Sequence, residues 1–168
     1  MKMKVTFISV ALGAVLLACG SSGSSSPGEL DAEQAKAKAT ALVPGTASEP
    51  VKLDKAEEHR WAVAVRLAGG ATVNVEIARA TGVVEEICGD DGPFDYDLPA
   101  PGAGLMTLAQ AKTKALAAKP GGIEKWEVKP PENLYELYVR DEAKKLWEIK
   151  MSADKGDVGS VLQKDTTD

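Results

Sequence analysis

The sequence predicts an α+β protein of two tandem repeats, each with one helix packed on a small antiparallel sheet in the order helix–strand–strand–strand. The segment QAKAKATALVPG at residues 34–45 nearly returns as QAKTKALAAKPG at residues 110–121. Between residues 30–45 and residues 106–121, eight of the sixteen positions are identical. Runs of alternating apolar residues follow both segments, and such alternation is typical of half-buried strands.

Each repeat begins with an alanine-rich helix. Asp31 and Thr107 are expected to cap the two helices, because Gln34 and Gln110 stand three residues later, as in a capping box. A Pro-Gly pair follows each helix and is expected to end it.

Short strands with period two follow each helix. The expected strands are VKL, WAVAVRL and VNVEI in the first repeat, and WEV, YELYV and WEIKM in the second. A short final strand at VVEEI in the first repeat stays open. The strands repeat at a shift of 74 residues and the helices at 76, so the loop after the helix is two residues shorter in the second repeat. The tryptophans fall mostly on inward faces: Trp61, Trp126 and Trp147. The other face is expected to meet water, and its polar residues are Arg66, Asn74, Glu76, Arg140, Glu148 and Lys150.

The amino terminus has the pattern of a targeting segment. Two lysines precede an apolar run of 13 residues, Val5–Leu17, which is too short to span a membrane and fits a secretory signal peptide. The motif LLAC that ends at Cys19 resembles the lipobox of bacterial lipoproteins. This resemblance implies cleavage after Ala18 and a lipid on Cys19. Gly20 follows, which by the same resemblance favours the outer membrane, facing the periplasm or the cell surface. An ordinary signal peptide that happens to contain Cys19 is the alternative.

The chain therefore divides into five segments. They are a signal peptide (1–18), a flexible Ser/Gly-rich tether (19–28), a first repeat (29–88), an acidic Gly/Pro linker (89–104) and a second repeat (105–164).

Composition limits the classes of partner. Without residues 1–18 the chain keeps 18 basic side chains (20 − 2) against 25 acidic ones, a net charge near −7. Nucleic acids and anionic lipid head groups require clusters of Lys and Arg, so neither is expected as a partner. If Cys19 carries lipid, Cys88 has no disulfide partner within the chain and is expected to be a small buried residue, although an intermolecular disulfide stays open.

No catalytic or metal-binding pattern is visible. His59 is the one histidine, and we expect it to be solvated at the end of a strand. No HExxH or CxxC spacing occurs, so no zinc site and no other cofactor are expected. The linker acids could collect Ca²⁺, but their spacing does not match an EF-hand and a solvated acidic linker is the preferred interpretation: Asp90, Asp91, Asp95 and Asp97. We expect a protein that is not an enzyme.

Both repeats resemble the PepSY domain. The residues that carry the resemblance are EQAKAKATALVPG and WAVAVRLAGGATVNVEIARATGVV in the first repeat, and AQAKTKALAAKPGG and LYELYVRDEAKKLWEIKMSADKGDV in the second. The family's final strand often ends in Asp before a Thr-Gly turn, whereas Ala78 and Ser152 lie there, and the acidic linker is foreign to the family pattern. The family occurs in metallopeptidase propeptides and in secreted or membrane proteins, and has no catalytic residues to transfer.

The resemblance implies a lipid-anchored envelope protein that binds another envelope protein, with a peptidase as one candidate partner, as inhibitor or regulator. A structural or assembly lipoprotein of the outer membrane with no peptidase target is the alternative. Tyr138 is the candidate exposed contact residue, and a buried position between the repeats is the alternative for it.

Overall fold

The computed structural model describes residues 28–55 and 58–165, which form one antiparallel sheet and two α-helices. The predicted signal peptide, Ala18, Cys19 and nearly all of the tether lie outside the described residues. In chain order the elements are α1 (Ala32–Leu42), β1 (Thr46–Ala47), β2 (Val51–Lys55), β3 (Glu58–Arg66), β4 (Thr72–Ala78), β5 (Val84–Asp91), α2 (Leu108–Ala118), β6 (Gly122–Lys129), the 3₁₀ turn η1 (Pro130–Glu132), β7 (Leu134–Arg140), β8 (Leu146–Ser152) and β9 (Val158–Lys164).

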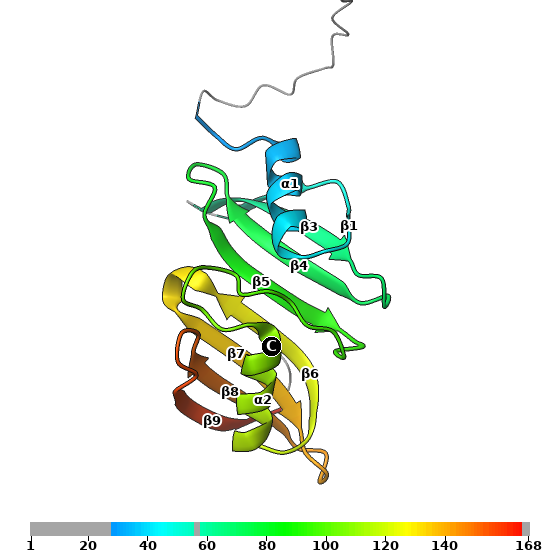
Figure 1. Ribbon diagram of the computed structural model, residues 1–168, viewed down its shortest axis with the longest axis vertical. Helices are drawn as coiled ribbons and strands as arrows, with labels where there is room; N and C mark the ends of the chain where they lie inside the picture. The colour runs from blue at the N-terminus through cyan, green and yellow to red at the C-terminus, as the bar shows by residue number, and fades with distance from the viewer. Residues whose placement is uncertain (1–27, 56–57, 166–168) are drawn as a thin grey trace, which may run out of the picture.

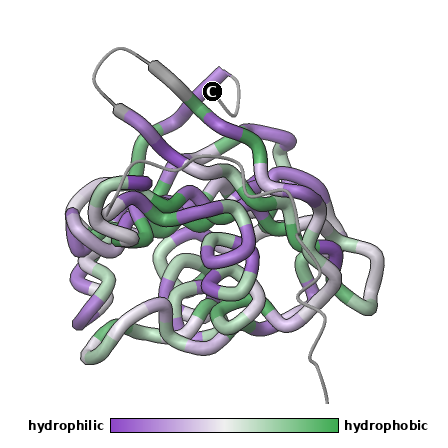
Figure 2. Tube along the Cα trace, turned by 90° about the horizontal axis from the view of Figure 1, so that it is seen from above, coloured by the Kyte–Doolittle hydropathy of each residue, from purple (hydrophilic) through white to green (hydrophobic). Residues whose placement is uncertain are grey.

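The strands lie in the order β1-β3-β4-β5-β6-β7-β8-β9, and β2 also pairs with β3 at the β1 edge. Both helices lie on the same side of the sheet (Figures 1 and 2). We call this side the helix face; it carries the alternate apolar residues of the strands, such as Val63, Val75, Leu137 and Ile149. The opposite side, which no described helix covers, is called the open face.

The prediction of two small three-stranded sheets is wrong in two respects. A fourth strand, β5 or β9, completes each half, and the pairing of β5 with β6 joins the halves into one sheet. The strand at VVEEI, which the sequence leaves open, is β5, whereas β9 is not predicted from the sequence. Both strands contain a bulge against the preceding strand, with one extra residue between Val84 and Glu86 and between Val158 and Ser160. A bulge interrupts the period-two pattern, which is the signal on which the prediction relied.

Small residues let each helix approach the sheet closely. Ala35 and Ala39 of α1, and Ala111 and Ala115 of α2, are fully buried. Both predicted caps are confirmed, because Asp31 and Thr107 each form a complete capping box with the glutamine three residues later. The two helices begin and end at residues 76 apart. One continuous apolar core extends under both.

The same tertiary hydrogen bond recurs at the start of both helices. The indole Nε1 of Trp61 donates to the carbonyl of Leu30 at 2.7 Å, and the hydroxyl of Tyr135 donates to the carbonyl of Met106 at 3.1 Å. Trp61 and Tyr135 are 74 residues apart, and Leu30 and Met106 are 76 apart. In both halves, an aromatic residue of the sheet therefore fixes the residue that precedes the helix cap.

The repeated Pro-Gly pair has a packing reason. A methyl group on Gly45 would overlap the backbone carbonyl of Arg66, and one on Gly121 would overlap the carbonyl of Arg140. Both glycines let the chain leave the helix against the strand that lies beneath it. The near-identity of the two segments thus reflects one steric requirement met twice.

Candidate functional site

Tyr138 is not an exposed contact residue. Its side chain is 3% exposed, and its hydroxyl donates to Oε1 of Glu148 at 3.0 Å. It lies on the open face, as its phase predicts, but the Lys125 ammonium lies 5.6 Å from its ring centroid and long neighbouring side chains cover it. Burial, together with the hydrogen bond to Glu148, raises the pKa of the Tyr138 hydroxyl.

Charged side chains interlock around Tyr138 on the open face. We call this group the charged lattice; its members are Lys125, Glu127, Lys129, Glu136, Glu148 and Lys150. Along the lattice, the ammonium-to-carboxylate distances are 2.8 Å for Lys125–Glu127, 3.4 Å for Lys129–Glu127, 3.4 Å for Lys129–Glu136, 3.2 Å for Lys150–Glu136 and 3.5 Å for Lys150–Glu148. Lys129 and Lys150 therefore each bridge two carboxylates of the lattice, which holds positive and negative groups in alternation across β6, β7 and β8. Lys125 bridges Glu127 and, at 3.5 Å, Asp90 of β5.

The pKa shifts of Lys125, Glu127 and Lys129 favour their ionised forms. Burial alone would raise the pKa of Glu127, but the hydrogen bonds and charges of Lys125 and Lys129 outweigh burial and lower it. Glu136 and Glu148 are only 6% and 5% exposed. Buried carboxylates need charged partners to offset their lost hydration, and the lysines supply these partners while fixing the charge pattern of the face.

The joint between the halves is built on Gly89. A Cβ at this position would lie 2.5 Å from Nε1 of Trp126 and 2.6 Å from the hydroxyl oxygen of Tyr96. The Trp126 indole packs on the bare backbone of β5 and donates to Tyr96 at 2.9 Å. Trp126 is 1% exposed, so its predicted place in the core is confirmed.

The predicted linker is ordered over residues 92–104, and its first three residues belong to β5. Oδ1 of Asp97 accepts hydrogen bonds from the backbone of Leu98 at 2.8 Å and of Ala109, in the first turn of α2, at 2.7 Å. Lys112 of α2 donates to the carbonyl of Phe94 at 3.0 Å. The carboxylate of Asp97 thus caps the start of α2 in addition to Thr107. Residues 28–55 and 58–165 contain no group of three or more side chains suited to hold a metal ion.

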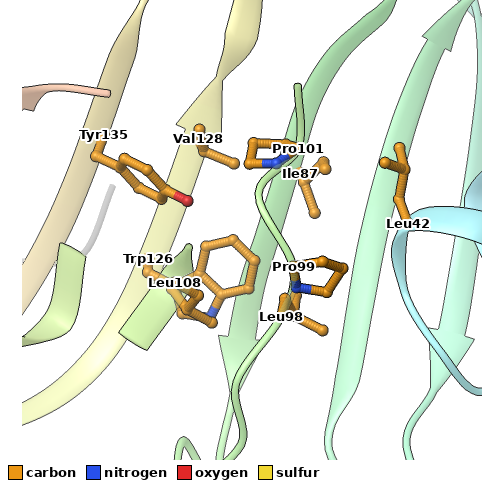
Figure 3. A pocket seen from close by; sticks show the side chains of 9 residues that line it. All are labelled: Leu42, Ile87, Leu98, Pro99, Pro101, Leu108, Trp126, Val128 and Tyr135. Atoms are coloured by element: carbon orange, nitrogen blue, oxygen red, sulfur yellow. The ribbon is translucent and has the colours of Figure 1, made fainter. Parts of the chain in front are cut away.

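A narrow apolar pocket lies under this linker (Figure 3). Its lining residues are Leu42, Ile87, Leu98, Pro99, Pro101, Leu108, Trp126, Val128 and Tyr135. Its volume of about 10 Å³ is no more than one water molecule requires. The pocket is therefore a packing gap at the joint and offers no room for a small-molecule ligand.

The two remaining candidates differ in exposure. Cys88 of β5 is free and 9% exposed, and its thiol lies 3.8 Å from Oδ2 of Asp90. Burial, and then the negative charges of Asp90 and Glu86, raise the pKa of the Cys88 thiol, which makes it a poor nucleophile. His59 lies exposed on β3, near the edge of the sheet, as expected.

The two outer edges of the sheet differ in protection. The β1/β2 edge is interrupted between Ala47 and Val51, where Pro50 lies, so only β2 (Val51–Lys55) offers a continuous backbone edge to a further strand. The β9 edge is seven residues long and carries three exposed apolar side chains, Val158 (43%), Val161 (36%) and Leu162 (53%). Sequence reasoning missed this edge, although the 74-residue shift maps residues 84–91 onto it.

The family comparison concerns the second half of the chain. Residues 105–161 match the family described as peptidase propeptide and YPEB domain, PepSY. The match to the PepSY family is confined to this segment. The matched segment contains α2 and most of the second half's sheet, including the charged lattice and the start of the β9 edge.

Other comparisons add little. No curated protein matches the chain significantly. A crystal structure at 1.85 Å of a protein from Clostridium difficile 630, provisionally described as a lipoprotein, is 18% identical; the match covers 68% of this chain and 80% of that one, with a TM-score of 0.36. Among the described residues, no helix has the length and apolar character needed to cross a membrane.

Proposed function

We propose that the protein is a lipid-anchored cell-envelope protein of PepSY type that binds another envelope protein, a peptidase being the first candidate, as inhibitor or regulator. The observation that carries this proposal is the PepSY match over residues 105–161, which contain a preorganised charged lattice on a sheet face without helices. Side chains already held by ion pairs lose little further freedom when a partner docks, so they favour a specific complex.

We further propose that the first half is a second, PepSY-like unit. The support is structural equivalence at single residues: the aromatic-to-carbonyl bonds of Trp61 and Tyr135, the close-packed Gly45 and Gly121, and the bulges of β5 and β9. The pairing of β5 with β6 gives the two units one shared sheet and one core.

The proposed attachment to the membrane rests on the sequence before residue 28. Cleavage after Ala18 would leave Cys19 as the first residue, with its lipid inserted in the membrane. Twelve residues (20–31) would then separate Cys19 from α1, a reach of roughly 40 Å when extended. Such a tether lets the open face meet a partner at the membrane surface, and the proposed location is the outer membrane.

A photo-crosslinking amino acid at Lys150 tests the binding proposal in intact envelopes. The Lys150 side chain is 38% exposed within the charged lattice. The matched control carries the same amino acid at Ala117, on the exposed side of α2. Capture of a peptidase from position 150 only, and slowing of its activity by the purified protein, would support the proposal. Capture of an outer-membrane assembly complex, with no effect on peptidases, would favour the structural alternative. Equal labelling from both positions would contradict a role for the open face.

A further inference from the structure

The free edge of β9 holds the positions that a strand covers in the first half. With the 74-residue shift, Val161 and Leu162 correspond to Ile87 and Cys88 of β5. Ile87 and Cys88 are 3% and 9% exposed because β6 pairs with them, opposite Val128 and Glu127. Val161 and Leu162 are 36% and 53% exposed. The outer edge of β9 is therefore equivalent to the edge of β5 that pairs with β6, but no described strand pairs with it.

The strand that corresponds to β6 in the first half is β2. Val51 pairs with Ala62 as Glu127 pairs with Glu136, and Lys52 pairs with Trp61 as Val128 pairs with Tyr135. The outer edge of β2 pairs with no strand among residues 28–55 and 58–165. Val51 is 59% exposed. At one end of the sheet β9 corresponds to β5, and at the other end β2 corresponds to β6, but β5 and β6 pair with each other and β9 and β2 do not.

We propose that copies of this chain associate head to tail, with β9 of one copy pairing antiparallel with β2 of the next. The register of the β5–β6 joint, when transferred, places Leu162 opposite Val51 of the next copy on the open face, and Val161 opposite Lys52. Of the large apolar side chains in the described part of the chain, Leu162 and Val51 are the two most exposed. Their pairing would remove both from water.

The order of side-chain size is reversed at the transferred joint. In the closed joint a large residue, Trp126, sits against Gly89. At the outer ends Gln163 corresponds to Gly89, and Pro50 takes the place of Trp126. The larger residue of this pair is therefore on β9, and the transferred pairing relies on the backbone groups of Val51 and Lys52, because Pro50 has no N–H to donate.

Charge at the transferred joint is complementary. Asp90 lies 3.5 Å from Lys125 across the closed joint. The corresponding residues at the outer ends are Lys164 and Glu49, which again have opposite charges but in the reverse order. Glu49 is 81% exposed although it also pairs with Lys36, so it is accessible to the next copy. This reversal favours β9 meeting β2 over either edge meeting its own kind.

The contact is heterologous, so it would generate open chains of copies, or a ring if the rotation between successive copies closes. It also lacks the ordered linker that reinforces the β5–β6 joint. We therefore expect association that depends on the local concentration of the protein.

Cysteine crosslinking of the full-length protein in its native envelope tests this inference. The chain that carries both Val51→Cys and Leu162→Cys should give a ladder of disulfide-linked oligomers on mild oxidation. Six strands separate β2 from β9 within one copy, roughly 30 Å, which is too far for an internal disulfide. Directly opposed residues of antiparallel strands have Cα atoms about 4.5–5.5 Å apart, which a disulfide can bridge.

Differently tagged single variants provide the matched control. A mixture of V51C and L162C chains should form mixed dimers, whereas neither variant alone should crosslink beyond the parent chain with Cys88. Glu49→Lys should lower the crosslinked fraction of the double-cysteine chain about two- to fivefold, and adding Lys164→Glu should restore it. No ladder, dimers from L162C alone, or failure of the charge swap to restore crosslinking would overturn the head-to-tail arrangement. Since all four side chains lie at the sheet edges, circular dichroism should show an unchanged fold.

Discussion

Replacing Gly89 with alanine tests how the two halves are joined. The new methyl would lie 2.5 Å from Nε1 of Trp126 and 2.6 Å from the hydroxyl oxygen of Tyr96, about 1 Å inside ordinary contact. Both groups belong to large rings in the joint, and moving them would break their mutual hydrogen bond of 2.9 Å. Overpacking costs about 1–3 kcal/mol and a lost hydrogen bond about 1 kcal/mol, so we expect about 3 kcal/mol of destabilisation.

Gly122→Ala is the matched control, because Gly122 also lies in a strand and has nothing within 4 Å of its Cβ position. It should change stability by less than about 1 kcal/mol, in the stabilising direction. Urea unfolding followed by circular dichroism measures both free energies. In a Tyr96→Phe background the Gly89→Ala penalty should fall, because one of the two clashing atoms is gone. If Gly89→Ala were as stable as Gly122→Ala, the described packing of Trp126 on Gly89 would be refuted.

Three further predictions follow from single sites. Gly121→Ala should destabilise the fold by about 1–3 kcal/mol in the same urea assay, because its methyl would overlap the carbonyl of Arg140. Burial, and then nearby negative charges, raise the pKa of Glu86. Its ionised form therefore destabilises the fold, and Glu86→Gln should stabilise it by less than about 1 kcal/mol at pH 7, with the gain lost as the pH falls through the raised pKa. The buried Cys88 thiol should react slowly with a thiol reagent at pH 8 and quickly in urea; equal rates would contradict its burial beside Asp90.

The local elements were the predictable part of the fold. The capping boxes at Asp31 and Thr107 are short-range patterns, and the structure contains both. The strands around Val63 and Leu137 follow strict alternation, which single-sequence reasoning detects. The sequence leaves β5 open as a short strand at VVEEI and does not predict β9, because bulges shift their phase; in β5, Val84 and Ile87 share a face at a spacing of three.

The site was less predictable because it depends on pairing between distant strands. Alternation places Tyr138 and Glu148 on the polar face, as expected. Their burial depends on the side chains of Lys125, from β6, and Lys150, from β8, which extend over the face. The joining of the two halves likewise depends on the register of β5 against β6, which no local pattern specifies.

Cross-strand backbone NOEs between β5 and β6 test the central claim, that two equivalent units share one sheet, most directly. We predict NOEs that link Ile87 with Val128, Cys88 with Glu127 and Gly89 with Trp126, alongside those within each half. Intact NOEs within both halves but none across these three pairs would contradict a shared sheet and would leave two independent domains.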